Sequence, residues 1–67
     1  MDSITVLEAL TANVGKRVRI IFSDSVTQVV EIDSVDCEGF LHSGDGGGDP
    51  KDFWTRFEDV KEVSFIR

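Results

Sequence analysis

The sequence has 67 residues, a formal net charge of −6, one cysteine and one histidine. A chain of this length forms a single domain, residues 1–67, and folding removes only about 60% of its unfolded surface from water, so self-association would add useful stability. The residue counts exclude an internal disulfide and argue against a zinc site, which needs three or four ligands, while the acidic balance opposes general affinity for nucleic acid.

A short helix is expected over about residues 2–13. An apolar stripe at helical spacing is formed by Ile4, Leu7, Leu10 and Val14. Gly15 follows at the position where a residue in the left-handed conformation commonly ends a helix. A helix this short does not persist alone in water, so we expect it to lie against the rest of the domain.

Two strands joined by a tight turn follow the helix. Residues 16–23 alternate apolar and polar side chains, which is typical of a half-buried strand. Asp24 and Ser25 supply residues that favour a turn. Residues 26–35 are rich in β-branched side chains and form the second strand. An isolated hairpin is not stable in water, so the remaining chain must cover or extend it.

Three further strands are expected over residues 40–43, 53–57 and 62–67. A flexible, glycine-rich loop, residues 44–50, separates the first two of them. Five antiparallel strands with mostly short connections favour a meander that curls into a small barrel, because closure removes exposed strand edges. The fourth and fifth strands are the expected open edges where closure is imperfect.

The alternation of apolar residues also predicts the interior. The side chains expected to be buried are Ile4, Leu7, Val18, Ile20, Phe22, Val30, Ile32, Phe53, Val60, Val63 and Phe65. Trp54 has two interpretations: an exposed stacking or interface residue, or a cover over one end of the barrel.

The stretch Gly-Lys-Arg-Val-Arg-Ile-Ile-Phe-Ser-Asp, residues 15–24, resembles the first-strand motif of Sm-like proteins. Residues 55–63 are similar in spacing to the second motif of that family. The resemblance implies a mainly β fold, in which an N-terminal helix precedes a five-stranded, strongly bent antiparallel small barrel of the Sm-like (SH3-type) kind, about residues 16–67. Three positions depart from the family pattern: Val30 replaces a mid-strand glycine, the base-contacting asparagine has no counterpart, and Phe57 replaces the glycine that follows the motif arginine.

Sm-like proteins assemble into rings and usually bind single-stranded RNA. The resemblance therefore implies a homo-oligomeric ring of about five to seven copies that binds single-stranded RNA. Asp36 and Arg56 match RNA-contacting positions of the family, and Phe40 is placed to stack on a base. In the family the fourth strand of one subunit pairs with the fifth strand of its neighbour. The corresponding interface residues here are Trp54, Thr55, Val63 and Phe65.

Lys16, Arg17 and Arg19 form the one basic patch of the chain. They are interpreted either as a strip that contacts RNA phosphates or as a solvated strand face that pairs with nearby acids. The net charge of −6 and the missing asparagine support an alternative function, a protein-interaction or assembly module that binds no RNA.

No catalytic constellation is present, so we expect neither enzyme activity, nor a cofactor, nor a small-molecule substrate. Cys37 lies in an acidic turn that disfavours its thiolate, and a 67-residue monomer has little room for a closed substrate pocket. Asp45, Asp49 and Asp52 lack the spacing of a calcium loop, so no metal is expected. We expect no signal peptide and no membrane-spanning run, and the lone thiol is typical of a reducing compartment, which together predict a cytoplasmic protein.

Overall fold

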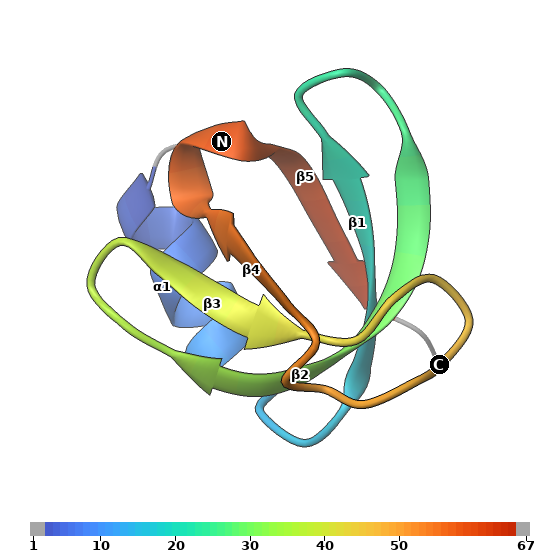
Figure 1. Ribbon diagram of the computed structural model, residues 1–67. Helices are drawn as coiled ribbons and strands as arrows, with labels where there is room; N and C mark the ends of the chain where they lie inside the picture. Colours follow the sequence, from blue (N-terminus) through green and yellow to red (C-terminus); the bar gives the residue numbers. More distant parts are fainter. Residues whose placement is uncertain (1–2, 66–67) are drawn as a thin grey trace.

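The computed structural model describes residues 3–65 as one helix followed by five strands (Figure 1). The elements are α1 (Ser3–Thr11), β1 (Arg17–Phe22), β2 (Thr27–Val35), β3 (Gly39–His42), β4 (Phe53–Arg56), the one-turn 3₁₀ helix η1 (Phe57–Asp59) and β5 (Val60–Phe65). The expected mainly β class and element order are confirmed. The expected helix start at residue 2 and strand end at residues 66–67 lie outside the described residues.

The five strands form one antiparallel sheet in the order β4-β3-β2-β1-β5. The expectation that the fourth and fifth strands are the edges is confirmed, but the sheet does not close into a barrel within the described chain. Since every pairing in this order is antiparallel, β4 and β5 run in the same direction along the sheet. A parallel pair needs a long crossover connection, whereas only the three residues of η1 join β4 to β5. The two edges therefore stay unpaired.

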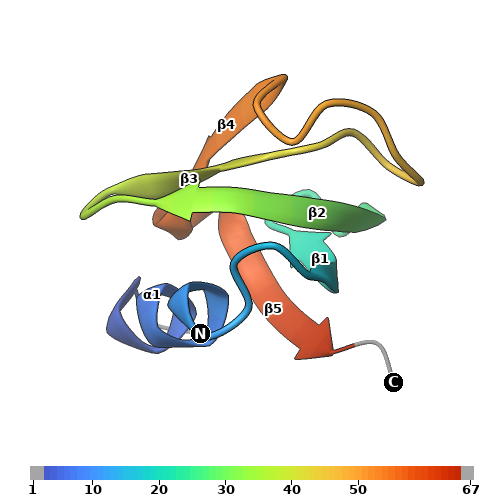
Figure 2. The ribbon, with the colours of Figure 1, turned by 90° about the horizontal axis from the view of Figure 1, so that it is seen from below.

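Strand β2 bends the sheet because it is shared between two halves. Its first part pairs with β1 from Thr27 to Glu31, and its last part pairs with β3, with a register shift between Ile32 and Ser34. Such an irregularity adds local bend and twist. In Figure 2, β2 runs between β3 and β4 on one side and α1 and β5 on the other. The bent sheet thus encloses the core.

The core consists of ten buried apolar side chains. They are Val6, Leu10, Val18, Ile20, Val30, Ile32, Phe40, Phe57, Val60 and Val63. Helix α1 contacts β2, β5 and η1, and it contributes Val6 and Leu10, one turn apart. The predicted helix face was correct at Leu10 and Leu7 but wrong at Ile4, which is 69% exposed, and at Val14, which follows the helix and is 46% exposed. The stripe that is buried lies on the Val6–Leu10 side, with Leu7 packed against its margin.

Two further predictions of burial were wrong for a common reason. Phe53 is 54% exposed and Phe65 is 56% exposed, because Phe53 is the first residue of β4 and Phe65 the last described residue of β5, so each lies at the end of an edge strand with a neighbour on one side only. Their place inside is taken by Phe40 and Phe57, whose ring centroids lie 6.3 Å apart. The open edges therefore leave aromatic side chains in contact with solvent.

Candidate functional site

Asp36 holds the turn between β2 and β3 together. Its Oδ1 accepts hydrogen bonds from the backbone N–H groups of Glu38 and Gly39, each at 2.7 Å, and its Oδ2 accepts one from Trp54 Nε1 at 3.1 Å. These donors, the Glu38 N–H first, lower the pKa of Asp36 against a smaller opposing effect of desolvation. Both carboxylate oxygens accept hydrogen bonds, so Asp36 has a structural role in this turn.

The indole of Trp54 lies across Gly39, which sits on the neighbouring strand. A Cβ at residue 39 would come within 2.7 Å of Trp54 Cζ2 and would also strike the carbonyl oxygen of Thr55. Only glycine permits this close approach. Trp54 remains 45% exposed, so one face of the ring is anchored to the β2–β3 turn and the other is open to solvent. The ring covers this turn rather than an end of the core.

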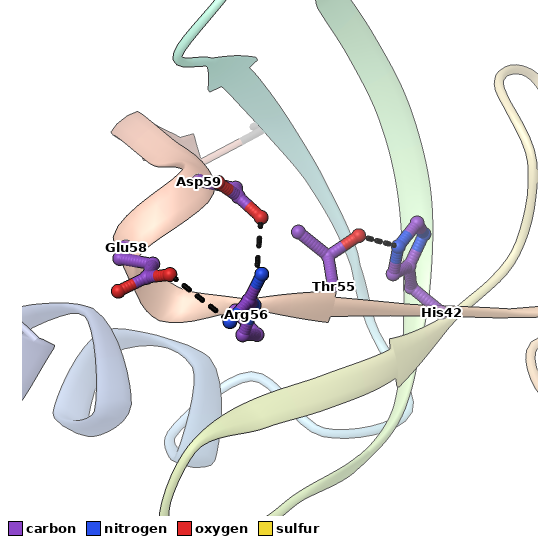
Figure 3. A network of polar contacts seen from close by, with 5 residues as sticks. All are labelled: His42, Thr55, Arg56, Glu58 and Asp59. Carbon is purple, nitrogen blue, oxygen red and sulfur yellow. Dashed lines mark hydrogen bonds and ion pairs between the residues drawn. The ribbon is translucent and has the colours of Figure 1, made fainter.

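Arg56 is paired with acids from its own segment (Figure 3). Its Nη1 lies 3.2 Å from Glu58 Oε1, and its Nε lies 4.0 Å from Asp59 Oδ2. All three side chains are more than half exposed, so these pairs contribute little to stability. Arg56 pairs in register with Gly39 and lines a shallow depression beside the β2–β3 turn. The structure thus brings Asp36, Trp54 and Arg56 to one end of the β3–β4 hairpin.

Phe40 does not belong to that exposed group. Its side chain is 0% exposed, and it packs against Phe57 and His42 in the core. The expectation that it stacks on a base is therefore wrong for this fold. The alternation of β3 sends Phe40 inward and Gly39 and Leu41 toward the outer face.

The basic patch lies on the outer face of β1, away from the β2–β3 turn. Lys16, Arg17 and Arg19 are exposed, and strands β2 and β3 separate β1 from β4. Arg17 stands opposite Glu31 of β2 in the strand register. Among residues 3–65, no ion pair involves any of the three basic side chains. The predicted RNA-contacting residues therefore form two separate groups, and Phe40 belongs to neither.

The expected interface residue Thr55 points inward and holds His42. The ring of His42 is 3% exposed, with Nδ1 2.7 Å from the carbonyl oxygen of Ser43 and Nε2 2.7 Å from Thr55 Oγ1 (Figure 3). A carbonyl oxygen only accepts, so Nδ1 carries the proton, Nε2 accepts and the Thr55 hydroxyl donates. Burial lowers the pKa of His42, although the Ser43 carbonyl opposes this effect.

The other expected interface residues differ in what they offer a neighbour. Val63 is 8% exposed and belongs to the chain's own core, whereas Phe65 and Trp54 expose about half of their surface.

The backbone N–H groups of β4 alternate between β3 and the open edge of the sheet. Phe57 N–H donates to Glu38 O at 3.0 Å, and antiparallel alternation then directs the N–H of Thr55 toward β3.

By the same alternation, the N–H groups of Trp54 and Arg56 face away from β3, at the open edge of β4. Arg56 has φ −76° and ψ 147°, an extended conformation suited to strand addition. The free edge therefore presents two backbone donors next to the exposed indole of Trp54. The sequence indicated an edge here, but not which residues direct their donors outward.

No three His, Cys, Asp or Glu side chains within residues 3–65 gather closely enough to hold a metal ion. Over the same described range, no helix has the length and apolar character needed to cross a membrane. Comparison with family models, curated proteins and solved structures found no match to this chain.

Proposed function

We propose that the chain is a non-catalytic assembly module of the Sm-like type, in which the β4 edge of one copy pairs with the β5 edge of the next. The observation that carries this proposal is a single sheet with two unpaired edges, β4 and β5, each bearing an exposed aromatic side chain. Such edges pair with another chain unless something blocks them. A head-to-tail contact that closes on itself gives a ring, and the family resemblance suggests about five to seven copies.

The energetics favour a contact that uses both side chains and backbone. Trp54 and Phe65 are each about half exposed, so covering them removes roughly 200 Å² of apolar surface, worth about 5 kcal/mol. Association costs an amount of similar size, so the rings alone give only a weak complex. Hydrogen bonds from the outward N–H groups of Trp54 and Arg56 supply direction and the remaining stability.

RNA binding is the second candidate function, and one observation favours it. Arg17 and Arg19 on β1 and Lys16 just before it are exposed, and none of them forms an ion pair within residues 3–65, which is what a phosphate-contacting strip requires. Three observations weigh against it: the acid partners of Arg56, the burial of Phe40 and the net charge of −6. We therefore rank assembly without RNA first.

A cytoplasmic location fits Cys37, an exposed free thiol, because reducing compartments keep such thiols unpaired.

Two experiments separate these candidates. Light scattering after size exclusion measures the mass of the assembly, and a variant that blocks the β4 edge should reduce that mass. Titration with a pool of single-stranded RNA at low salt measures nucleic-acid binding independently of mass. Assembly without RNA binding supports the first candidate, assembly with RNA binding supports the ring that acts on RNA, and a monomer that binds no RNA contradicts both.

A further inference from the structure

A groove of about 550 Å³ opens between the β1–β2 turn and the β3–β4 half of the sheet. Phe22 at the end of β1, Val26 in the turn and Phe53 on β4 supply its apolar walls, and His42 lies between them. Val26 is 47% exposed and Phe53 is 54% exposed, so the walls are accessible from solvent. The volume falls in the range of sites that bind small ligands or single side chains.

Aromatic rings line the inner part of the groove. The Phe53 and His42 rings are stacked, with centroids 5.9 Å apart and an angle of 23° between their planes. The Phe22 ring lies 6.2 Å from His42 on another side. A Cβ at Gly44 would meet Phe53 Cε2 at 3.3 Å, so the phenyl ring also lies close to the chain after β3. Phe53 thus has one face supported and more than half of its surface open.

Three carboxylates, of Asp24, Asp45 and Asp59, belong to the lining of the same groove. Two of them are held in place by their own loops: Asp24 Oδ1 accepts from Val26 N–H at 3.0 Å, and Asp45 Oδ1 accepts from Val29 N–H at 2.8 Å. Each of these two keeps its second oxygen free of any hydrogen bond in the described structure. Asp59 Oδ2 lies 4.0 Å from Arg56 Nε, so its charge is partly balanced by an exposed ion pair.

No positive charge balances these acids inside the groove. Among the described residues, no lysine or arginine belongs to the groove lining. His42 is the single titratable base there, and its lowered pKa keeps the ring neutral at pH 7. The groove therefore combines apolar and aromatic walls with the negative charge of three carboxylates, of which only Asp59 is paired with a base, Arg56, and the matching ligand is apolar along its length and cationic at its end.

We propose that this groove binds a lysine or arginine side chain carried by a segment of a partner protein. The aliphatic stem of such a side chain packs against Val26 and Phe22, and the charged head lies over the open face of Phe53. The free oxygens of Asp24 and Asp45 accept its N–H groups. Negative potential from all three acids repels phosphate groups, so the groove selects a basic peptide and disfavours nucleic acid. This inference does not rest on the assembly proposal, because its ligand contacts are Phe22, Val26, Phe53, Asp24 and Asp45, although Trp54 on the β4 edge also belongs to the groove lining.

Calorimetric titration with capped pentapeptides tests the proposal. The probe peptides differ only at a central arginine, lysine, alanine or glutamate between uncharged residues. We expect the arginine and lysine peptides to bind at low salt, at least tenfold more tightly than the alanine peptide, and the glutamate peptide to show no binding. Amide chemical shifts should move at Phe53, Asp24 and Asp45, and not on the outer face of β1.

Matched variants locate the site. Asp24→Asn and Asp45→Asn keep the Oδ1 acceptor that holds each loop but remove the charge, and each should weaken the arginine peptide about two- to fivefold. Phe53→Leu keeps apolar volume, removes the aromatic face and should weaken it by a similar factor. Glu62→Gln, exposed on β5 and outside the groove, is the control and should bind like the unaltered chain.

Equal binding of the arginine and alanine peptides, or unchanged binding in the Asp24→Asn, Asp45→Asn double variant, would overturn the proposal. The mass of that double variant, measured in the same samples, distinguishes this inference from the assembly proposal. Loss of peptide binding with unchanged mass supports the groove as a peptide site. Loss of both would mean that a second copy of the chain occupies the groove, which also overturns the proposal.

Discussion

The indole Nε1 of Trp54 donates a hydrogen bond to Asp36 Oδ2 across 3.1 Å, and this contact ties the β4 edge to the turn between β2 and β3. The other oxygen of Asp36 is already engaged by the Glu38 and Gly39 N–H groups. The indole in turn lies over Gly39, where a side chain has no room. Trp54, Asp36 and Gly39 thus form one structural unit, which holds the β4 edge in place for the proposed assembly contact.

The first prediction concerns Gly39. Gly39→Ala should destabilise the fold by about 1–3 kcal/mol, because the added methyl group meets both the Trp54 ring and the rigid carbonyl of Thr55. Urea melts followed by the fluorescence of Trp54, the single tryptophan, measure this change. Gly44→Ala is the control, since its methyl group meets the exposed Phe53 ring at 3.3 Å, which can shift, and the Gly47 carbonyl oxygen at an ordinary contact distance of 3.6 Å. Equal effects at the two glycines would contradict the described packing of the indole.

The second prediction compares two isoleucines. Ile20→Ala should cost about 2–5 kcal/mol because Ile20 is 0% exposed in the centre of β1. Ile4→Ala should change stability by less than about 0.5 kcal/mol, because Ile4 is 69% exposed on α1. Chemical denaturation of both variants measures the difference. A large loss at Ile4 together with a small loss at Ile20 would show that the helix face and the β1 register are assigned incorrectly.

The third prediction concerns pH. Burial sets the folded-state pKa of His42 below its ordinary value of about 6.5, so the unfolded chain binds the proton more readily. The contribution of neutral His42 to the free energy of unfolding should therefore be fully present above about pH 6.5. It should decline as the pH falls below that value toward the folded-state pKa. Urea melts between pH 7.5 and pH 5 measure this decline.

His42→Gln is the control for that titration, because His42 is the single histidine and glutamine does not ionise. The variant should be less stable at pH 7.5, since it disturbs the bonds to Ser43 and Thr55, yet its stability should vary little between pH 7.5 and pH 5. The same acid sensitivity in the variant as in the unaltered chain would place the titrating group elsewhere.

The fourth prediction concerns RNA. Any binding of single-stranded RNA should depend on Lys16, Arg17 and Arg19, and three phosphate contacts give a salt slope of about −2 in the logarithm of affinity. Replacement of all three by glutamine should abolish binding, whereas Arg56→Ala should change it little because Glu58 and Asp59 already pair with Arg56. Fluorescence anisotropy at several salt concentrations measures both. A dominant effect of Arg56→Ala would move the RNA site to the β2–β3 turn.

The sequence predicted the β1–β2 hairpin and the presence of strands β4 and β5, because alternating apolar residues and turn residues act within short segments. Alternation placed Val18 and Ile20 inside correctly, and the short connections led to the observed element order. Burial at the edges depends on which strands lack a neighbour, which alternation does not encode, so Phe53 and Phe65 were assigned to the core wrongly. Phe40 was interpreted as exposed from the family resemblance, while its phase along β3 turns it inward.

The candidate sites depend on contacts between distant residues, and for that reason they were only partly predictable. Asp36 was expected to contact RNA, whereas its hydrogen bond to Trp54, which joins positions 18 residues apart, gives it a structural role that no local sequence pattern indicates. The groove brings Asp24 and Asp45 together with Phe53 from three separate segments of the chain. No spacing within any one segment indicates that arrangement.

The central claim is that copies join through the β4 edge, and the mass in solution tests it most directly. Arg56→Pro removes an outward N–H at a residue whose φ of −76° already suits proline, and Arg56→Ala is matched to it because it removes the side chain and keeps the donor. Light scattering after size exclusion should give at least five times the 7.4 kDa of one chain for the unaltered protein and Arg56→Ala, and a much smaller mass for folded Arg56→Pro. A mass of 7.4 kDa for the unaltered protein at tens of micromolar, or an undiminished assembly in Arg56→Pro, would contradict the claim.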